Sequence, residues 1–138
     1  MSDLIRRMEA TQKTMDRFQS RAFDWNGSTC IHLARFHLRQ MGHKPPPLPQ
    51  IRSALSARRA MDKAGYANVA AIFDGLMLPE ITPAAMMLGD IGVVPGDDGF
   101  DAVVINAGGK MLGWREDVAG GIVPIADALS HVTRAFRL

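Results

Sequence analysis

The hydrophobic periodicity of this chain changes once, near residue 88, and that change limits the folds it can adopt. Before it, apolar residues recur at spacings of three and four, which is typical of amphipathic helices. After it, short runs rich in β-branched residues alternate with turn signals, which is typical of strands. A run of helices followed by a run of strands indicates an α+β fold. We therefore predict N-terminal helices packed on a small antiparallel sheet.

The first part of the chain contains four predicted helices and a proline-rich connector. The predicted helices span residues 3–21, 30–41, 53–64 and 68–77. Residues 43–49 follow the second helix and favour an extended polyproline conformation, because proline lacks the N–H that a helix interior needs. The apolar stripe of the first helix consists of Leu4, Met8, Thr11, Met15 and Phe18. This stripe packs either on its own domain or on a partner subunit, and the spacing leaves both interpretations open.

The second part of the chain contains short predicted strands. They span residues 91–94, 102–106, 110–114 and 121–125, with a last strand within 131–138 after a turn of helix at 126–130. A chain of 138 residues fits one compact unit, so we divide it into an N-terminal amphipathic helix, 1–22, and a single α+β domain, 23–138. The residues predicted to be largely buried are Trp25, Leu33, Leu38, Phe73, Val93, Val104 and Trp114.

Charge is unevenly distributed along the chain. Residues 1–64 carry 12 Lys or Arg and 5 Asp or Glu, whereas residues 65–138 carry 4 and 9, so the first part is at +7 and the second at −5. The basic residues are scattered along helices without interleaved aromatics, so we expect no nucleic-acid binding. A chain with two oppositely charged parts suits an assembly with unlike neighbours.

Several site classes are excluded by the residues present. One cysteine allows no internal disulfide and no cysteine-based metal site. His32 and His37 are five apart and flank no acid, which is not the spacing of a zinc peptidase. The Gly-Gly turn at 107–109 lacks the helix, Lys and Ser or Thr of a phosphate loop. No run of about 20 apolar residues could span a membrane, so we expect no metal, no cofactor and no membrane-spanning segment.

Cys30 is the strongest candidate for a chemical role. It stands at the predicted start of the second helix, after the aromatic-rich loop 23–29. Unpaired N–H groups at a helix N-terminus stabilise a thiolate, so this position suits a nucleophile. The competing interpretation is a small buried apolar side chain. A nucleophilic role requires a base within reach of the sulfur.

Residues 20–115 resemble the NlpC branch of the papain-like cysteine peptidases, which are small bacterial and phage enzymes of the cell wall. The resemblance rests on three segments in the same order: residues 25–30 at the head of a helix, residues 88–94 with Gly89-Asp90, and the strand–turn–strand at 101–111. It implies a papain-like, NlpC-type fold with Cys30 at the nucleophile position. In active members the strand that begins near 101 opens with the catalytic histidine.

The chain is also similar to an uncharacterised phage-encoded family of the same fold, found among tail genes. The shared features are Trp25 in an aromatic segment before Cys30, the Gly89-Asp90 pair, and the terminal sequence Phe136-Arg137-Leu138. In that family an acidic residue commonly precedes the cysteine, whereas this chain has Thr29. The resemblance implies partners among other tail proteins, such as the hub, the distal tail and the tape measure.

Asp101 occupies the histidine position that the resemblance implies. A carboxylate beside a thiol raises the pKa of the thiol and cannot replace an imidazole as base and acid. His32 points about 200° away from Cys30 on the same helix, and His37 lies about 10 Å along it. His43 lies in the connector, which leaves His131 as the remote alternative base. Each histidine is otherwise an ordinary surface or packing side chain.

These observations favour a structural protein over an enzyme. We expect a component of the distal tail of a tailed bacteriophage, at the tail tip or hub, made in the host cytoplasm and incorporated into the virion. The domain would be a catalytically degenerate NlpC-like fold. The first alternative is a cell-wall cysteine endopeptidase that cuts peptidoglycan peptides during genome entry, with Cys30 as nucleophile. The second is an assembly factor that is absent from the virion.

Overall fold

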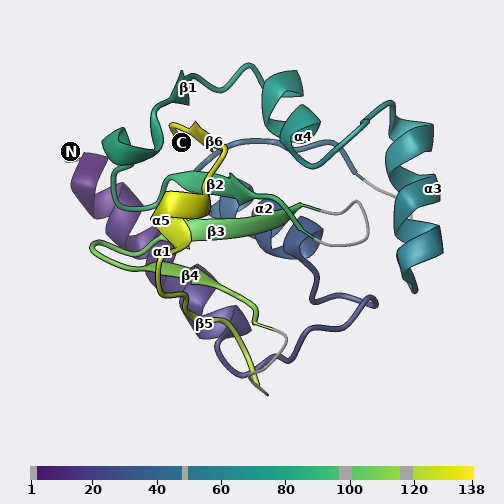
Figure 1. Cartoon of the computed structure of the whole chain (residues 1–138), viewed down its shortest axis with the longest axis horizontal. Coiled ribbons are helices and arrows are strands. Elements are labelled where there is room, and N and C mark those ends of the chain that lie inside the picture. Colours follow the sequence, from purple (N-terminus) through teal and green to yellow (C-terminus); the bar gives the residue numbers. More distant parts are fainter. Residues whose placement is uncertain (1–2, 48–49, 97–100, 116–119) are drawn as a thin grey trace.

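The computed structural model describes residues 3–47, 50–96, 101–115 and 120–138, and it shows an α+β fold (Figure 1). The helices are α1 (Asp3–Phe18), α2 (Cys30–Gln40), α3 (Ala54–Ala64), α4 (Ala70–Gly75), the 3-10 turn η1 (Pro83–Ala85) and α5 (Ala128–His131). The strands are β1 (Glu80–Ile81), β2 (Ile91–Val94), β3 (Ala102–Asn106), β4 (Met111–Gly113), β5 (Val123–Pro124) and β6 (Arg134–Phe136). The predicted fold class, N-terminal helices with an antiparallel sheet, is confirmed.

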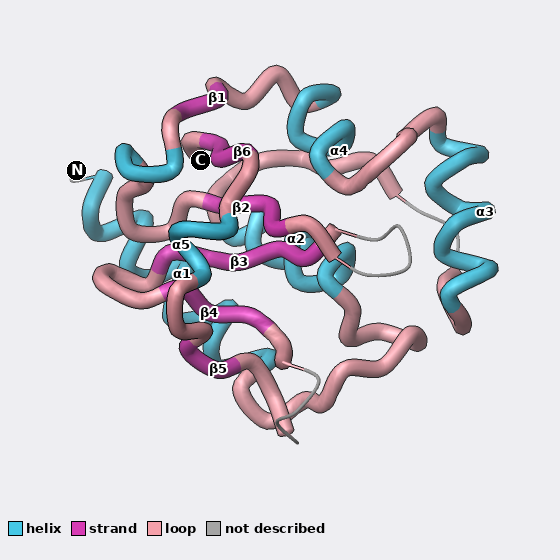
Figure 2. The backbone as a smooth tube through the Cα atoms, in the orientation of Figure 1, coloured by secondary structure: helices cyan, strands magenta, loops and turns pink. Residues whose placement is uncertain are grey.

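The strands form one six-stranded sheet in the order β1-β6-β2-β3-β4-β5, and every neighbouring pair is antiparallel (Figure 2). From β2 to β5 the chain runs as a meander, since each strand pairs with the next one along the sequence. The last strand, β6, then inserts between β1 and β2, where Ala135 lies opposite Gly92. The C-terminal strand is therefore an interior strand of the sheet, next to the edge strand β1.

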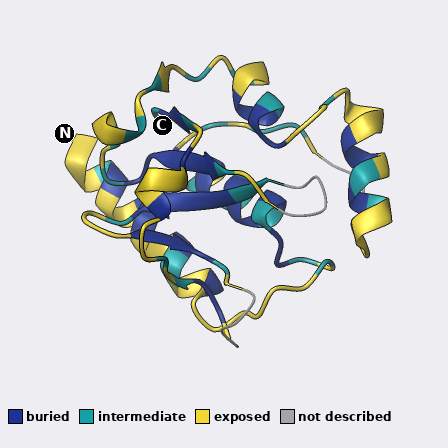
Figure 3. Cartoon of the chain, viewed as in Figure 1, coloured by how far each residue is buried: buried dark blue, intermediate teal, exposed yellow. Residues whose placement is uncertain are grey.

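The two faces of the sheet have different coverings. Val93, Val103 and Ile105 face the larger core, which also contains buried residues of α1 and α2. Val104 faces a smaller cluster on the opposite side, where Val132 follows α5. Figure 1 shows α5 on the near side of the sheet and α1 and α2 behind it. Figure 3 shows that the central strands are buried, which follows from this covering on both faces.

Capping residues explain where the helices begin and end. Ser53 caps α3 through a reciprocal pair of hydrogen bonds with Ser56, so orphan N–H groups of the first turn are satisfied. Gly65 ends the same helix in the left-handed conformation at φ 84°, which glycine adopts without a steric cost.

The predicted stripe of α1 is half wrong. Thr11 and Phe18 are buried, but Leu4 and Met8 are 55% and 54% exposed. The face of α1 that packs on the domain is made of Arg7, Ala10, Thr11, Thr14 and Phe18. The helix is rotated from the expected orientation because Arg7 turns inward to a buried partner, described below. A charged residue thus takes a core position that a hydrophobic pattern assigns to its neighbours.

Most of the predicted core is confirmed. Leu33, Leu38, Phe73, Val93 and Val104 are buried. Trp25 and Trp114 are only partly buried and pack against the edge of the core, where the Trp114 indole N–H donates to the carbonyl of Arg21 at 2.8 Å. None of the helices in the described residues is long and apolar enough for a membrane span.

Candidate functional site

The loop before Cys30 is a tight turn held by its own backbone. Asp24 and Ser28 exchange two backbone hydrogen bonds of 3.1 and 2.9 Å, and Gly27 takes φ 126°, a conformation that residues with a Cβ rarely adopt. The Asp24 carboxylate accepts the N–H of Asn26 at 2.9 Å. This turn delivers the chain to Thr29 in the extended conformation from which α2 starts.

An aromatic cluster anchors the same loop to the sheet. The ring of Phe23 packs edge-on against Trp25 and Trp114, with centroids 5.2 and 6.0 Å apart. Trp114 in turn packs edge-on against Phe18 of α1 at 5.5 Å. The aromatic residues that precede Cys30 therefore fix the position of the loop between α1 and the residue after β4.

The first turn of α2 is capped by Thr29 and His32. The backbone N–H of His32 donates to the Thr29 hydroxyl at 3.3 Å, and the N–H of Thr29 donates to His32 Nδ1 at 3.2 Å. Burial lowers the pKa of His32, and the charge of Arg35 adds to the effect, so the ring stays neutral and keeps the Nδ1 lone pair that the cap requires. His32 is thus committed to the start of the helix and not to Cys30.

The thiol of Cys30 lies against β3. The N–H of Val103 donates to the sulfur, which favours the thiolate, but burial has the larger effect and raises the pKa of the thiol above its ordinary value. The group is therefore a neutral thiol at neutral pH. The favourable N-terminus of the helix does not compensate for the loss of solvent.

Asp101 immediately precedes β3, two residues before Val103, and is partly buried. The structure places β3 next to Cys30 through the backbone of Val103. Within the described residues, Asp101 forms no hydrogen bond or ion pair with Cys30, and burial and Val103 alone account for the pKa of the thiol. Asp101 therefore does not contact the thiol as a base would.

The four histidines all lie in the described part of the chain, and none of them is hydrogen-bonded to Cys30. His131 is exposed at the end of α5, and the adjacent Val132 packs on the face of the sheet opposite to α2. His43 contacts the carbonyl oxygen of Leu138 at 3.1 Å. The structure therefore does not bring the predicted alternative base to the predicted nucleophile.

His37 is fully buried and connects three segments. Its Nε2 lies 2.7 Å from the carbonyl oxygen of Gly89 and its Nδ1 lies 2.8 Å from the hydroxyl of Thr14 on α1. Burial lowers the pKa of His37 to about 4. The neutral ring must carry its hydrogen on Nε2, because the carbonyl can only accept, so Nδ1 is an acceptor. The single hydroxyl hydrogen of Thr14 lies within reach of both this nitrogen and the carbonyl oxygen of Ala10, at 2.8 and 3.0 Å.

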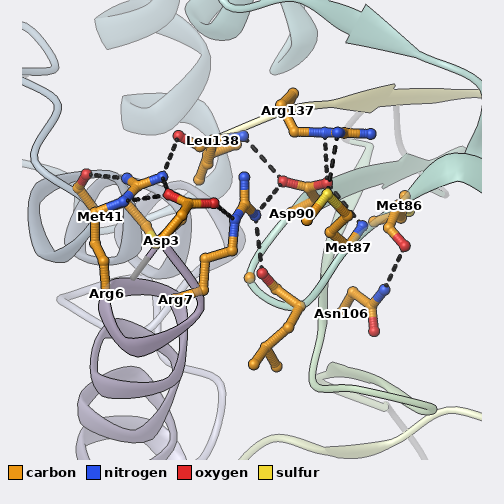
Figure 4. Close-up of polar contacts among 12 residues, drawn as sticks. Asp3, Arg6, Arg7, Met41, Met86, Met87, Asp90, Asn106, Arg137 and Leu138 are labelled. Carbon is orange, nitrogen blue, oxygen red and sulfur yellow. Dashed lines mark hydrogen bonds and ion pairs between the residues drawn. The ribbon is translucent and has the colours of Figure 1, made fainter. Parts of the chain in front are cut away.

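The carboxylate of Asp90 is fully buried and is contacted from several segments of the chain (Figure 4). Its Oδ1 accepts hydrogen bonds from Arg7 Nη1 at 2.8 Å and from the backbone N–H of Leu138 at 3.0 Å. Its Oδ2 accepts the N–H of Met87 at 2.8 Å and lies 3.1 Å from Arg137 Nε. The Arg137 N–H is not aligned for a hydrogen bond, so this last contact is an ion pair only.

Arg7 makes further hydrogen bonds from its buried side chain, of which only 3% is exposed. It donates to the carbonyl of Leu88 at 2.9 Å and to the Asp3 carboxylate at 2.7 Å, in addition to Asp90. Hydrogen bonds to Asp90 and Asp3 raise the pKa of Arg7 against the opposing effect of burial. The Gly-Asp pair and the C-terminal Arg-Leu, which the sequence presents as separate features, therefore meet at one ion-pair cluster.

Sequence reasoning missed Arg7. An arginine in an amphipathic helix reads as solvent-facing, and the only available signal was the lack of an apolar residue at this point of the buried face. Among the described residues, no group of three His, Cys, Asp or Glu is arranged to hold a metal ion.

The profile of a family described as a domain of unknown function, DUF6950, matches residues 5–138. The chain belongs to this family. The DUF6950 match includes Arg7 on α1 as well as Cys30, Asp90 and the C-terminal residues, so the family unit contains every described residue that contacts Asp90. No curated protein and no solved structure matches the chain.

We expect Asp90→Asn to lower the free energy of unfolding by about 3–5 kcal/mol, because the change removes the buried one of the two carboxylates that pair with the Arg7 guanidinium. Urea unfolding followed by circular dichroism measures the effect. Asp3→Asn is the matched control, since Asp3 is an exposed partner of the same arginine, and its effect should be much smaller, because solvent screens exposed ion pairs. Equal losses in the two variants would show that the buried pair does not stabilise the fold.

We expect stability to fall as the pH is lowered from about 6.5 to about 4. The folded pKa of His37 is depressed to about 4, so in this window the unfolded chain binds a proton that the folded chain does not, and unfolding is favoured by up to roughly 3 kcal/mol. His37→Gln should flatten this part of the profile, whereas His131→Gln, at an exposed site, should leave it unchanged. A profile that is identical in all three proteins would contradict the assignment.

Proposed function

We propose that this protein is a structural component of the distal tail of a tailed bacteriophage, at the tail tip or hub, and that its domain is a catalytically degenerate NlpC-like fold. The observation that carries the proposal is the state of Cys30. Its thiol stands where a papain-like nucleophile would stand, but its pKa is raised by burial and no histidine contacts it.

Three features support a papain-like origin of the fold. Cys30 is the first residue of α2, α2 packs against β3, and β2 follows directly on the Gly89-Asp90 pair. In a papain-like peptidase the helix bearing the cysteine packs on the sheet whose strand carries the histidine. Here Asp101 precedes that strand, and acyl transfer needs an imidazole that takes and returns a proton. These features support a peptidase-like fold that lacks the catalytic base.

The surface of α1 supports a role in assembly. Leu4, Ile5 and Met8 are 55%, 45% and 54% exposed, because Arg7 occupies the inward face of the helix. Three neighbouring exposed apolar side chains on one helix suit docking into a groove of a partner protein. The partners we propose are the other tail proteins, namely the hub, the distal tail protein and the tape measure. The protein would be made in the host cytoplasm and then incorporated into the virion.

The alternative is a cell-wall cysteine endopeptidase that cuts peptidoglycan peptides during genome entry. The N–H of Val103 favours this function, because it donates to the Cys30 sulfur and would stabilise a thiolate. In this alternative Cys30 is the nucleophile, and His131 would have to reach it from the opposite face of the sheet.

The proposed function predicts that the chain is present in purified virions of the phage that encodes it, cross-linked to at least one other tail protein. Mass spectrometry of intact, nuclease-treated particles measures both. Ile5→Glu with Met8→Glu should reduce incorporation while leaving the fold intact, because both side chains are exposed. Glu9→Ala with Gln12→Ala, also at exposed positions of α1 and outside the two hollows described below, is the control on the same helix. Virions that contain none of this chain would refute the tail-component function and favour an assembly factor.

The thiol provides the test against the peptidase. We expect alkylation of Cys30 by iodoacetamide to be slow at neutral pH and to rise with a midpoint above the ordinary thiol pKa of about 8.5, because burial disfavours the thiolate. The purified protein should release no more stem peptides from murein than the Cys30→Ala variant does. A midpoint well below pH ~7, together with murein cleavage that Cys30→Ala abolishes, would establish the enzyme.

A further inference from the structure

The outward side of α2 and the connector after it enclose a basic hollow of about 550 Å³. Arg35 and Arg39 lie one turn apart on α2 and form one wall, and His43 and Lys44 lie at the end of the helix. The remaining wall is the proline-rich connector, which contributes Pro45 and Pro47. Among the described residues, no carboxylate lines this hollow.

The cations of the hollow are held close together. Burial lowers the pKa of Arg35, and the charge of Arg39 lowers it further. The Arg35 Nε donates to the carbonyl of Pro46 at 3.2 Å, which fixes the guanidinium against the connector. Like charges one helical turn apart are destabilising when nothing neutralises them. An anion in the hollow would remove this repulsion.

Acidic groups of the same chain are engaged elsewhere. Asp90 pairs with Arg7 in the core, and Asp74 and Glu80 both pair with Arg134 at 2.8 and 2.6 Å. These three carboxylates are therefore already paired with other arginines. An anionic partner would supply the carboxylates that the described lining of the hollow lacks.

A second hollow on the other side of α2 extends the basic surface. Its cations are Lys13, Arg17 and Arg21, and its single carboxylate, Asp16, already accepts a hydrogen bond from Gln12 at 2.8 Å. The Arg17 guanidinium lies 4.9 Å from the centroid of Phe36. Phe36 and Gln40 of α2 line the second hollow, and the preceding residues, Arg35 and Arg39, line the first. This outward face of α2 forms a ridge between the two hollows, so an extended ligand could contact both.

We propose that this ridge docks an acidic segment of a partner protein, with Asp or Glu carboxylates entering the hollow between Arg35, Arg39 and Lys44. The guanidinium fork binds carboxylates in a bidentate manner, and the extended connector offers a wall for an extended peptide. Single-stranded nucleic acid needs free aromatic faces for stacking, and the first hollow offers no Phe, Tyr or Trp among its described lining residues. Its one aromatic ring, the imidazole of His43, already contacts the carbonyl oxygen of Leu138 at 3.1 Å. Phe36, in the second, is covered by Arg17 and packed edge-on against Phe18.

That the partner is a tail protein rests on the proposed function. The binding of acidic peptide to the ridge can be tested on the purified chain alone. The probe is a fluorescein-labelled peptide of alternating aspartate and glycine, followed by fluorescence anisotropy at low ionic strength. We expect saturable binding that weakens with added salt. Arg39→Gln with Lys44→Gln should weaken it by about tenfold, the equivalent of one charge-assisted hydrogen bond.

The control is Arg59→Gln with Lys63→Gln on α3, which removes the same charge from exposed positions outside both hollows. It should leave binding unchanged, and circular dichroism confirms that all variants fold. Equal weakening in the two double variants would show diffuse attraction and overturn the proposal. So would tighter binding of a labelled oligothymidylate of the same length, or full competition by inorganic phosphate at an equal concentration of charge.

The two proposals fail separately. A chain that is present in virions but does not bind the acidic peptide refutes the docking site and leaves the tail function standing. A chain that binds the peptide through Arg39 and Lys44 but is absent from virions refutes the tail function and leaves the docking site standing.

Discussion

The buried ion pair between Arg7 and Asp90 is the interaction on which the rest of the fold depends. Removing two charges from water costs several kcal/mol, and only complete hydrogen bonding offsets that cost. Asp90 meets this requirement with Arg7 and the N–H groups of Met87 and Leu138. The pair therefore joins α1 to the start of β2 and to the C-terminal residues, which are far apart in the sequence. It also sets the rotation of α1, and so determines that Leu4 and Met8 face outward.

Gly89 and Asp90 are neighbours with two different polar roles, since Gly89 takes part in a neutral hydrogen bond and Asp90 in an ion pair. Gly89 takes φ 88°, and a Cβ there would lie 3.2 Å from the Thr11 hydroxyl oxygen, so a side chain would be strained and crowded against α1. Its carbonyl accepts from His37 while the next residue binds Arg7. Gly-Asp at the head of this strand is thus explained by packing alone. Its presence, which contributed to the resemblance to peptidases, requires no catalytic function.

The parts of the fold that the sequence predicted well are those with local causes. The bounds of β2 and β3 match the predicted 91–94 and 102–106, because β-branched runs and turn residues mark them. β1 is not among the predicted strands, because a two-residue strand has no periodicity and exists only through its pairing with β6. The site could be predicted only in part: Cys30 at the start of α2 follows from capping, whereas the roles of Arg7 and His37 depend on segments brought together by the fold.

Cys30 shows how environment outweighs local position in setting reactivity. A helix N-terminus contributes about 0.3–1 kcal/mol toward a nearby negative charge, whereas desolvation can shift the pKa of a fully buried group by several units. Burial is the larger cause at Cys30, and the N–H of Val103 opposes it only in part. Cys30 packs against the core at the start of α2, and this packing raises the pKa of its thiol. The packing that stabilises this segment therefore keeps the thiol neutral, so stability and nucleophilicity are in conflict at this position.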